Sequence, residues 1–64
     1  MPKYDVDVEL IGEDGNAFAI MGKVRRALRK ARVPQKEIDA YLDEATAGDY
    51  DHLLRVTMET VNVL

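Results

Sequence analysis

Hydrophobic and polar residues alternate along the first part of the chain, from Lys3 to Ile11. The apolar side of this segment consists of Tyr4, Val6, Val8 and Leu10, and the polar side of Lys3, Asp5, Asp7 and Glu9. A period of two residues is typical of a β-strand that buries one of its faces. The pattern therefore predicts a strand over residues 3–11.

A different pattern follows a turn at residues 12–16 that contains two glycines. Asp14 or Asn16 can cap the start of a helix there. Beyond the turn, the apolar residues share one arc of about 120° when successive residues are placed 100° apart, which is typical of an amphipathic helix. The core positions of this helix are Ala17, Ile20, Met21, Val24, Ala27, Leu28 and Ala31. Pro34 is expected to end it.

The second half of the chain predicts two more helices. Pro34 also favours the start of the next helix. Its apolar residues follow the i, i+3, i+4, i+7 spacing and are Ile38, Tyr41, Leu42 and Ala45. Gly48 is suited to the position just after the C-cap of this helix. The spacing thus predicts a helix that ends shortly before Gly48.

Asp49 is placed to cap a third helix that starts near Tyr50. The predicted apolar face of this helix consists of Tyr50, Leu53, Leu54, Met58 and Val61. Residues 56–63 are rich in β-branched side chains, which also suit a strand. We favour helix for this segment, and a partial strand is the alternative.

The order strand, helix, helix, helix predicts one small α+β domain over residues 1–64. A lone strand leaves backbone donors and acceptors unpaired on both edges. Unless the C-terminal segment supplies the missing strand, the same strand of a second copy is expected to pair with it across a two-fold axis. We therefore expect a homo-oligomer, with Tyr4, Val6 and Val8 at the contact between subunits.

Composition also favours an oligomer. A chain of 64 residues buries only about 60% of its unfolded surface, and such chains usually need a disulfide, a metal or a partner chain. The sequence has no cysteine and one histidine, His52, which excludes disulfides and any metal site built on thiolates or several histidines of one chain. Association with another copy remains, and we expect no metal and no cofactor.

The first turns of the first helix carry small or apolar residues outside the core arc, namely Gly15, Phe18, Ala19 and Gly22. Gly15, Ala19 and Gly22 are spaced so that another backbone could come close to this side of the helix. Phe18 could insert into a neighbouring subunit. The alternative is that Phe18 packs against the third helix of its own chain.

The net charge of −3 conceals an uneven distribution of charge. Seven of the nine lysines and arginines lie between residues 23 and 36, with no acidic residue among them. On the helical wheel they occupy the side opposite the core. One flank carries Arg25, Arg29 and Arg32, and the other carries Lys23, Arg26 and Lys30. Helix surfaces usually mix charges of both signs, so this segment calls for a counter-charge.

There are three candidates for this counter-charge. The first is the chain's own acidic residues, either on the strand or on the second helix: Asp5, Asp7, Glu9, Glu37, Asp39, Asp43 and Glu44. The second is a small nucleotide-like anion, whose phosphates suit arginine side chains. The third is nucleic acid, which we do not expect because a chain of net charge −3 repels a polyanion. As the binding function we expect the small anion, held by Lys23, Arg25, Arg26, Arg29, Lys30 and Arg32 in a pocket between subunits.

Catalysis is not expected. Serine is absent and His52 stands among acidic residues at the start of a helix, where its expected role is to complete the turn beside Asp49. The glycines at residues 12–16 lack the lysine and the serine or threonine of a phosphate-binding loop. The chain also has no apolar run of about 20 residues that could span a membrane, and its first residues are charged where a signal peptide would be apolar. We expect a cytoplasmic protein.

Two segments, residues 8–24 and 48–54, resemble short uncharacterised proteins of bacteriophages and prophages. This resemblance implies a small accessory phage protein in the cytoplasm of the host cell. Proteins of this kind often act without catalysis, either by sequestering a small signalling nucleotide or by blocking a host protein. The basic residues favour sequestration, and an interaction module that holds a host protein is the alternative.

Overall fold

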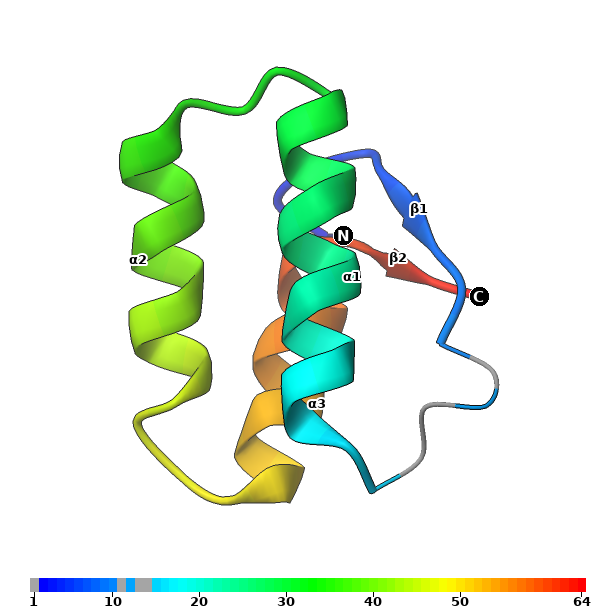
Figure 1. Ribbon diagram of the computed structural model, residues 1–64, viewed down its shortest axis with the longest axis vertical. Coiled ribbons are helices and arrows are strands. Elements are labelled where there is room, and N and C mark those ends of the chain that lie inside the picture. The colour runs from blue at the N-terminus through cyan, green and yellow to red at the C-terminus, as the bar shows by residue number, and fades with distance from the viewer. Residues whose placement is uncertain (1, 11, 13–14) are drawn as a thin grey trace.

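The computed structural model describes residues 2–10, 12 and 15–64. The elements in chain order are β1 (Asp7–Val8), α1 (Ala17–Lys30), α2 (Gln35–Ala45), α3 (Tyr50–Thr60) and β2 (Asn62–Val63). In Figure 1, α1 and α2 stand side by side, α3 lies behind them, and the two strands lie beside α1. The predicted order of one N-terminal strand followed by three helices is confirmed, and the structure adds a second strand at the C-terminal end of α3.

The alternation predicted for the N-terminal segment is present in the burial of its side chains. From Lys3 to Leu10, every odd-numbered residue is exposed and every even-numbered residue is at least half-buried. Val8 is the most deeply buried of them, with 4% of its surface exposed. The strand itself is much shorter than residues 3–11, because only Asp7 and Val8 pair in the ladder.

The mate of β1 is the C-terminal segment of the same chain. β1 and β2 run parallel, with Asp7 beside Asn62 and Val8 beside Val63. The amide of Asn62 donates to the carbonyl of Val6 at 2.9 Å, and the amide of Leu64 donates to that of Val8 at 2.9 Å. A parallel pair needs a long crossover, which the three helices provide. This pairing was the open alternative, and it removes the need for a second copy that a lone strand creates.

Residues 56–63 combine the two structures that their sequence suggests. α3 continues to Thr60, and the chain then extends from Val61 into β2. The end of α3 is also held by the N-terminal segment, because the amides of Lys3 and Tyr4 donate to the carbonyls of Glu59 and Thr60 at 2.8 and 2.9 Å. The two ends of the chain therefore stabilise each other.

Two predicted helix caps are confirmed. Oδ1 of Asn16 accepts from the amide of Ala19 at 3.0 Å, and Oδ1 of Asp49 accepts from the amide of His52 at 2.9 Å. The prediction that α1 continues to Pro34 is wrong. α1 ends at Lys30, and the chain turns through Arg32, whose φ of 65° lies in the left-handed region.

The role predicted for Gly48 is also wrong. The C-cap of α2 is Thr46, whose hydroxyl donates to the carbonyl of Leu42 at 2.9 Å. Gly48 is required for another reason: a Cβ atom built on it would lie 2.7 Å from Cγ of His52. The glycine therefore makes room for the imidazole ring at the α2–α3 turn.

The core lies between the three helices and β1. Its buried apolar residues are Val8, Ile20, Val24, Leu28, Ile38, Tyr41, Ala45, Leu53, Val56 and Val61. Two predicted core residues are exposed instead. Ala31 lies just beyond the end of α1, and Met58 has 62% of its surface exposed. On α3, Thr57 is fully buried although the apolar spacing does not predict it in the core. Its burial is tolerated because its Oγ1 lies 2.7 Å from the hydroxyl of Tyr41 and so has a polar partner.

Candidate functional site

The side of α1 remote from the core carries a group of exposed basic residues. We call this group, with the residue at the following turn, the basic face: Arg25, Arg26, Arg29, Lys30 and Arg32. The core stripe Ile20, Val24 and Leu28 fixes the opposite side of α1, so these positions point to solvent. Lys23, the sixth predicted ligand residue, is half-buried, and its Nζ donates to the carbonyl of Glu9 at 3.1 Å.

The basic face has no counter-charge among the carboxylates that the structure describes. None of its five residues forms an ion pair with them. The ion pair found between described groups is His52 Nε2 with Glu44 Oε1, at 3.8 Å, on α2 and α3. Direct ion pairing of these five residues with acidic residues of the same chain, one form of the first alternative, is therefore not seen within residues 2–10, 12 and 15–64.

Several of those acidic residues have other partners. The side-chain amide of Asn62 donates to Oδ1 of Asp5 at 2.8 Å and to Oδ1 of Asp7 at 3.0 Å. Nε2 of Gln35 donates to Oδ1 of Asp39 at 2.9 Å. The hydroxyl of Tyr4 donates to Glu37, and this hydrogen bond raises the pKa of Tyr4. The acidic residues thus serve the packing of the strands and the start of α2.

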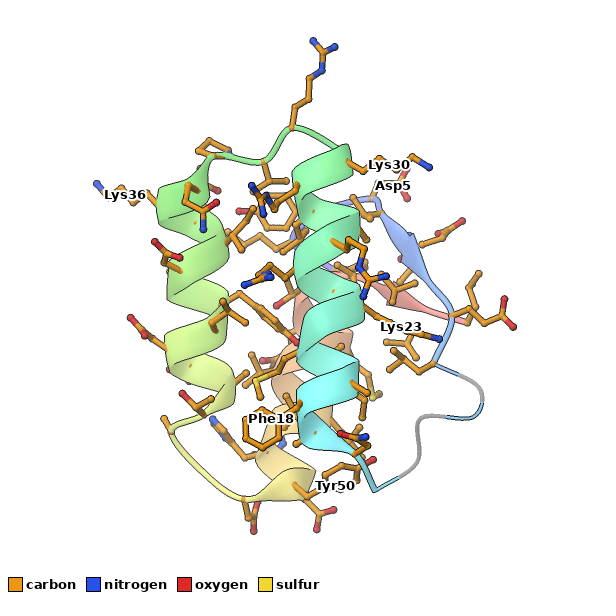
Figure 2. All side chains as sticks on the ribbon, viewed as in Figure 1. Asp5, Phe18, Lys23, Lys30, Lys36 and Tyr50 are labelled. Carbon is orange, nitrogen blue, oxygen red and sulfur yellow. The ribbon has the colours of Figure 1, made fainter. Side chains whose placement is uncertain are left out.

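The basic residues separate into groups that point in different directions. Figure 2 shows Lys30 at the end of α1, on the side where the strands lie, and Lys36 pointing away from the far side of α2. Arg25 instead faces α2, where it lines a groove of about 380 Å³ together with Phe18, Met21, Gly22, Leu42 and Thr46. We call this feature the α1–α2 groove. Lys36 is thus remote from the charges of α1.

Phe18 is the most exposed large apolar side chain among the described residues, with 84% of its surface accessible. Figure 2 shows its ring between the lower parts of α1 and α2. The ring also lines a second hollow of about 260 Å³ with residues of α2 and α3. At this exposure it is not packed against α3, so the interpretation that it belongs to the core of its own chain is wrong.

Gly22 and Ala19 lie near Phe18 on the same side of α1. A Cβ atom built on Gly22 would meet no atom within 4 Å. Ala19 is half-buried, and Gly15 is exposed with a φ of 78°, its amide donating to the hydroxyl of Tyr50 at 2.9 Å. The predicted contact residues of the strand lie elsewhere: Val8 is buried in the core, and Tyr4 and Val6 pack against it.

His52 stabilises the turn between α2 and α3. Its ring Nε2 lies 2.9 Å from the carbonyl of Glu44, so it links the end of α2 to the start of α3. The sequence predicts that His52 lies beside the Asp49 cap. It indicates neither the hydrogen bond of His52 with the Glu44 carbonyl nor the space that Gly48 leaves for the imidazole ring. The described residues contain no group of three or more histidine, cysteine or acidic side chains that could hold a metal ion.

The helices of the described residues are all too short or too polar to cross a bilayer. Comparisons of the chain with protein-family models, with curated proteins and with solved structures find no match. The candidate functional surfaces of the protein are therefore the basic face and the surface around Phe18.

Proposed function

We propose that this protein is a non-catalytic binding protein whose basic face holds an anionic, nucleotide-like small molecule, and that it works as a homo-oligomer. The observation that carries the proposal is the lack of a carboxylate partner for Arg25, Arg26, Arg29, Lys30 and Arg32 among the described residues. Arginine binds phosphate oxygens through two parallel hydrogen bonds. A phosphate group would thus supply the missing counter-charge.

The size of the basic face favours a compact anion over a nucleic acid. Residues four apart on a helix are separated by about 6 Å along its axis, so Arg26 and Lys30 suit one or two phosphates. The chain also carries exposed acidic residues on the neighbouring elements, including Asp5 before β1 and Asp39 on α2. These would repel a long polyanion but act weakly on a small ligand at distances beyond a Debye length of about 8 Å.

The resemblance of residues 8–24 and 48–54 to phage proteins implies either sequestration of a small nucleotide or blocking of a host protein, and the basic face favours sequestration. A protein that only sequesters needs affinity and abundance and no catalytic group. Arg26 and Lys30 would hold the phosphates of a small nucleotide in the host cytoplasm. Sequestration requires that the nucleotide binds reversibly and is not turned over.

The second candidate function is an interaction module that holds a host protein. The observation that favours it is the exposure of Phe18, at 84%, beside Gly22, which has open space around it. Exposed aromatic side chains are common anchors of protein interfaces. Such a module would not respond to nucleotides.

Native mass spectrometry of the purified protein tests the proposal first, because one spectrum gives the subunit number and the mass of any retained ligand. Thermal unfolding with ADP and with a cyclic dinucleotide follows. A ligand present at a hundredfold excess over its Kd stabilises the folded state by about 2.7 kcal/mol. Arg26→Glu should abolish this gain, whereas Lys36→Glu, which changes a lysine on the far side of α2, should preserve it.

Two outcomes would contradict the proposal. One is unfolding that neither nucleotide shifts at millimolar concentration. The other is a gain that Arg26→Glu and Lys36→Glu reduce equally, since this would show a response to net charge and not to the basic face. Either result would favour the interaction module.

A further inference from the structure

We propose that a second copy of the chain docks on the open face of α1 and α2, related by a two-fold axis that runs parallel to these helices. We call this the α1–α2 face. Its residues on α1 are Phe18, Gly22, Arg25 and Arg29, and those on α2 and its C-cap are Asp39, Leu42, Asp43 and Thr46. The inference does not depend on the bound anion, because it rests on this face alone.

The α1–α2 face is open because α3 covers the two helices from behind only (Figure 1). The α1–α2 groove runs between the helices on this face and has a volume of about 380 Å³. Phe18, Gly22 and Arg25 of α1 line it together with Leu42 of α2 and with Thr46, the C-cap of α2. Since the chain reverses between the helices, Arg29 lies further along toward the start of α2.

Two residues of α1 on this face have no explanation within one chain. Phe18 exposes 84% of its surface. Gly22 lies within α1, where glycine weakens a helix relative to alanine, yet a Cβ atom there would meet nothing within 4 Å. Both are explained when another element packs closely on this face, since Phe18 is then buried and Gly22 admits the approaching backbone.

The charges of the face favour a second copy as that element. Arg25 and Arg29, spaced i, i+4, lie on the flank of α1 turned toward α2. Asp39 and Asp43, with the same spacing, lie on α2 at positions next to those of Leu42 and Thr46 on the wheel. All four are exposed, and no ion pair joins the two arginines to a described carboxylate. The face is therefore basic along one helix and acidic along the other.

Rotation about an axis parallel to the helices brings these unlike charges together. It places α1 of one copy over α2 of the other at the same height, so that Arg25 faces Asp43 of the partner subunit. In the same way Arg29 faces the partner's Asp39, and the two Phe18 rings meet near the axis. The four helices then form an antiparallel bundle. An axis perpendicular to the helices would instead set α1 against α1 and arginine against arginine.

The dimer leaves the other flank of α1 open. Arg26 and Lys30 lie on the side of α1 turned away from α2, so they remain free to bind an anion. Anion binding and dimer formation can therefore fail separately. Loss of the nucleotide response in Arg26→Glu addresses the ligand, and the subunit number of variants on the α1–α2 face addresses the dimer.

Analytical ultracentrifugation over a range of concentrations, with the full chain, tests the dimer. The wild type is expected to dimerise, and Phe18→Ser is expected to raise the dimer dissociation constant at least tenfold. Met58→Ser is the matched control, because Met58 is also a large exposed apolar residue, at 62%, but lies on α3. Circular dichroism checks that each variant keeps its helices.

A charge exchange tests the orientation. Arg25→Asp and Asp43→Arg should each weaken the dimer about tenfold, and the double variant should restore the affinity to within about threefold of the wild type, because the opposite charges again face each other. A monomeric wild type at 100 μM or above would overturn the proposal. So would a Phe18→Ser dimer as tight as the wild type, or a double variant as weak as the weaker single one.

Discussion

The contact between Tyr41 and Thr57 places a polar pair inside the core. Tyr41 is 5% exposed and Thr57 is fully buried, and their hydroxyl oxygens lie 2.7 Å apart. Among the described residues, no buried side-chain nitrogen or oxygen lacks a hydrogen-bond partner. Burial raises the pKa of Tyr41, and the hydrogen bond with Thr57 offsets part of that rise. The pair thus links the packing of α2 on α3 to the protonation of one phenol.

This link predicts that the protein loses stability in alkali. The unfolded chain releases the Tyr41 proton near pH 10, whereas the folded chain holds it to higher pH because its pKa is raised. The stabilisation is complete below about pH 10 and is lost as the pH rises through the folded pKa. Denaturation in urea between pH 8 and 11.5 should show a fall in the free energy of unfolding that is less steep in Tyr41→Phe.

Two controls belong to this measurement. Tyr4→Phe should also make the alkaline fall less steep, since the hydrogen bond to Glu37 raises the pKa of Tyr4. At pH 7, Tyr41→Phe should lower the free energy of unfolding by about 1–2 kcal/mol, because Thr57 loses its partner. Equal slopes in the wild type and in Tyr41→Phe would contradict the role given to Tyr41.

The pairing of β1 with β2 depends on one side chain as well as on the backbone. Asn62 donates to both Asp5 and Asp7 through its side-chain amide. Two carboxylates close together on one strand repel each other, and the amide hydrogens offset that repulsion. The N- and C-terminal segments of the chain are therefore joined by an amide that bridges two acidic residues.

Asn62→Asp tests this bridge. The change removes both hydrogen bonds and adds a third negative charge, so the free energy of unfolding should fall by about 1–3 kcal/mol. Asn62→Leu, which removes the hydrogen bonds without adding charge, should cost less. Urea denaturation followed by circular dichroism measures both. An Asn62→Asp variant that is as stable as the wild type would show that the amide does not support the strand pair.

The elements show which parts of this fold a sequence can predict. The three helices and the caps at Asn16 and Asp49 follow from interactions within four residues, and apolar spacing expresses them directly. The strand pair joins residues that are 55 positions apart, and nothing in the spacing of either segment encodes its partner. The burial of Thr57 was missed for the same reason, since it depends on a hydroxyl from another helix.

The candidate site is likewise predictable from the sequence only where it depends on a single helix. Helical spacing places Arg25, Arg26, Arg29 and Lys30 opposite the core, because that follows from α1 alone. Whether acidic residues of the same chain neutralise them depends on how the helices and strands pack. Asp39 of α2 and Asp5 of the N-terminal segment lie on neighbouring parts of the fold yet accept hydrogen bonds from Gln35 and Asn62. That the basic face forms no ion pair with the carboxylates of residues 2–10, 12 and 15–64 is thus a property of the tertiary structure.

At the scale of the whole molecule, two electrostatic effects oppose each other in the proposed dimer. Each copy has a net charge of −3, which disfavours association. Their centres would lie about one molecular width apart, and the shortest extent of the chain is 21 Å. A Debye length of about 8 Å at 0.15 M salt screens most of this repulsion. The pairs of Arg25 and Arg29 with the partner's carboxylates act at contact distance and are screened less, so attraction prevails at physiological salt.

Raising the salt concentration from 0.15 to 1 M should therefore weaken the dimer. The long-range repulsion is already screened at 0.15 M, and the remaining effect of salt is on four exposed ion pairs, each worth about 0.2–1 kcal/mol. We expect the dissociation constant to rise about three- to tenfold, as measured by analytical ultracentrifugation. In the double variant Arg25→Gln/Asp43→Asn this dependence should be roughly halved, because two of the four pairs are absent and the Phe18 contact remains. A dimer that tightens with salt would show that repulsion between the net charges prevails, and that the arginines do not face the partner's acidic helix.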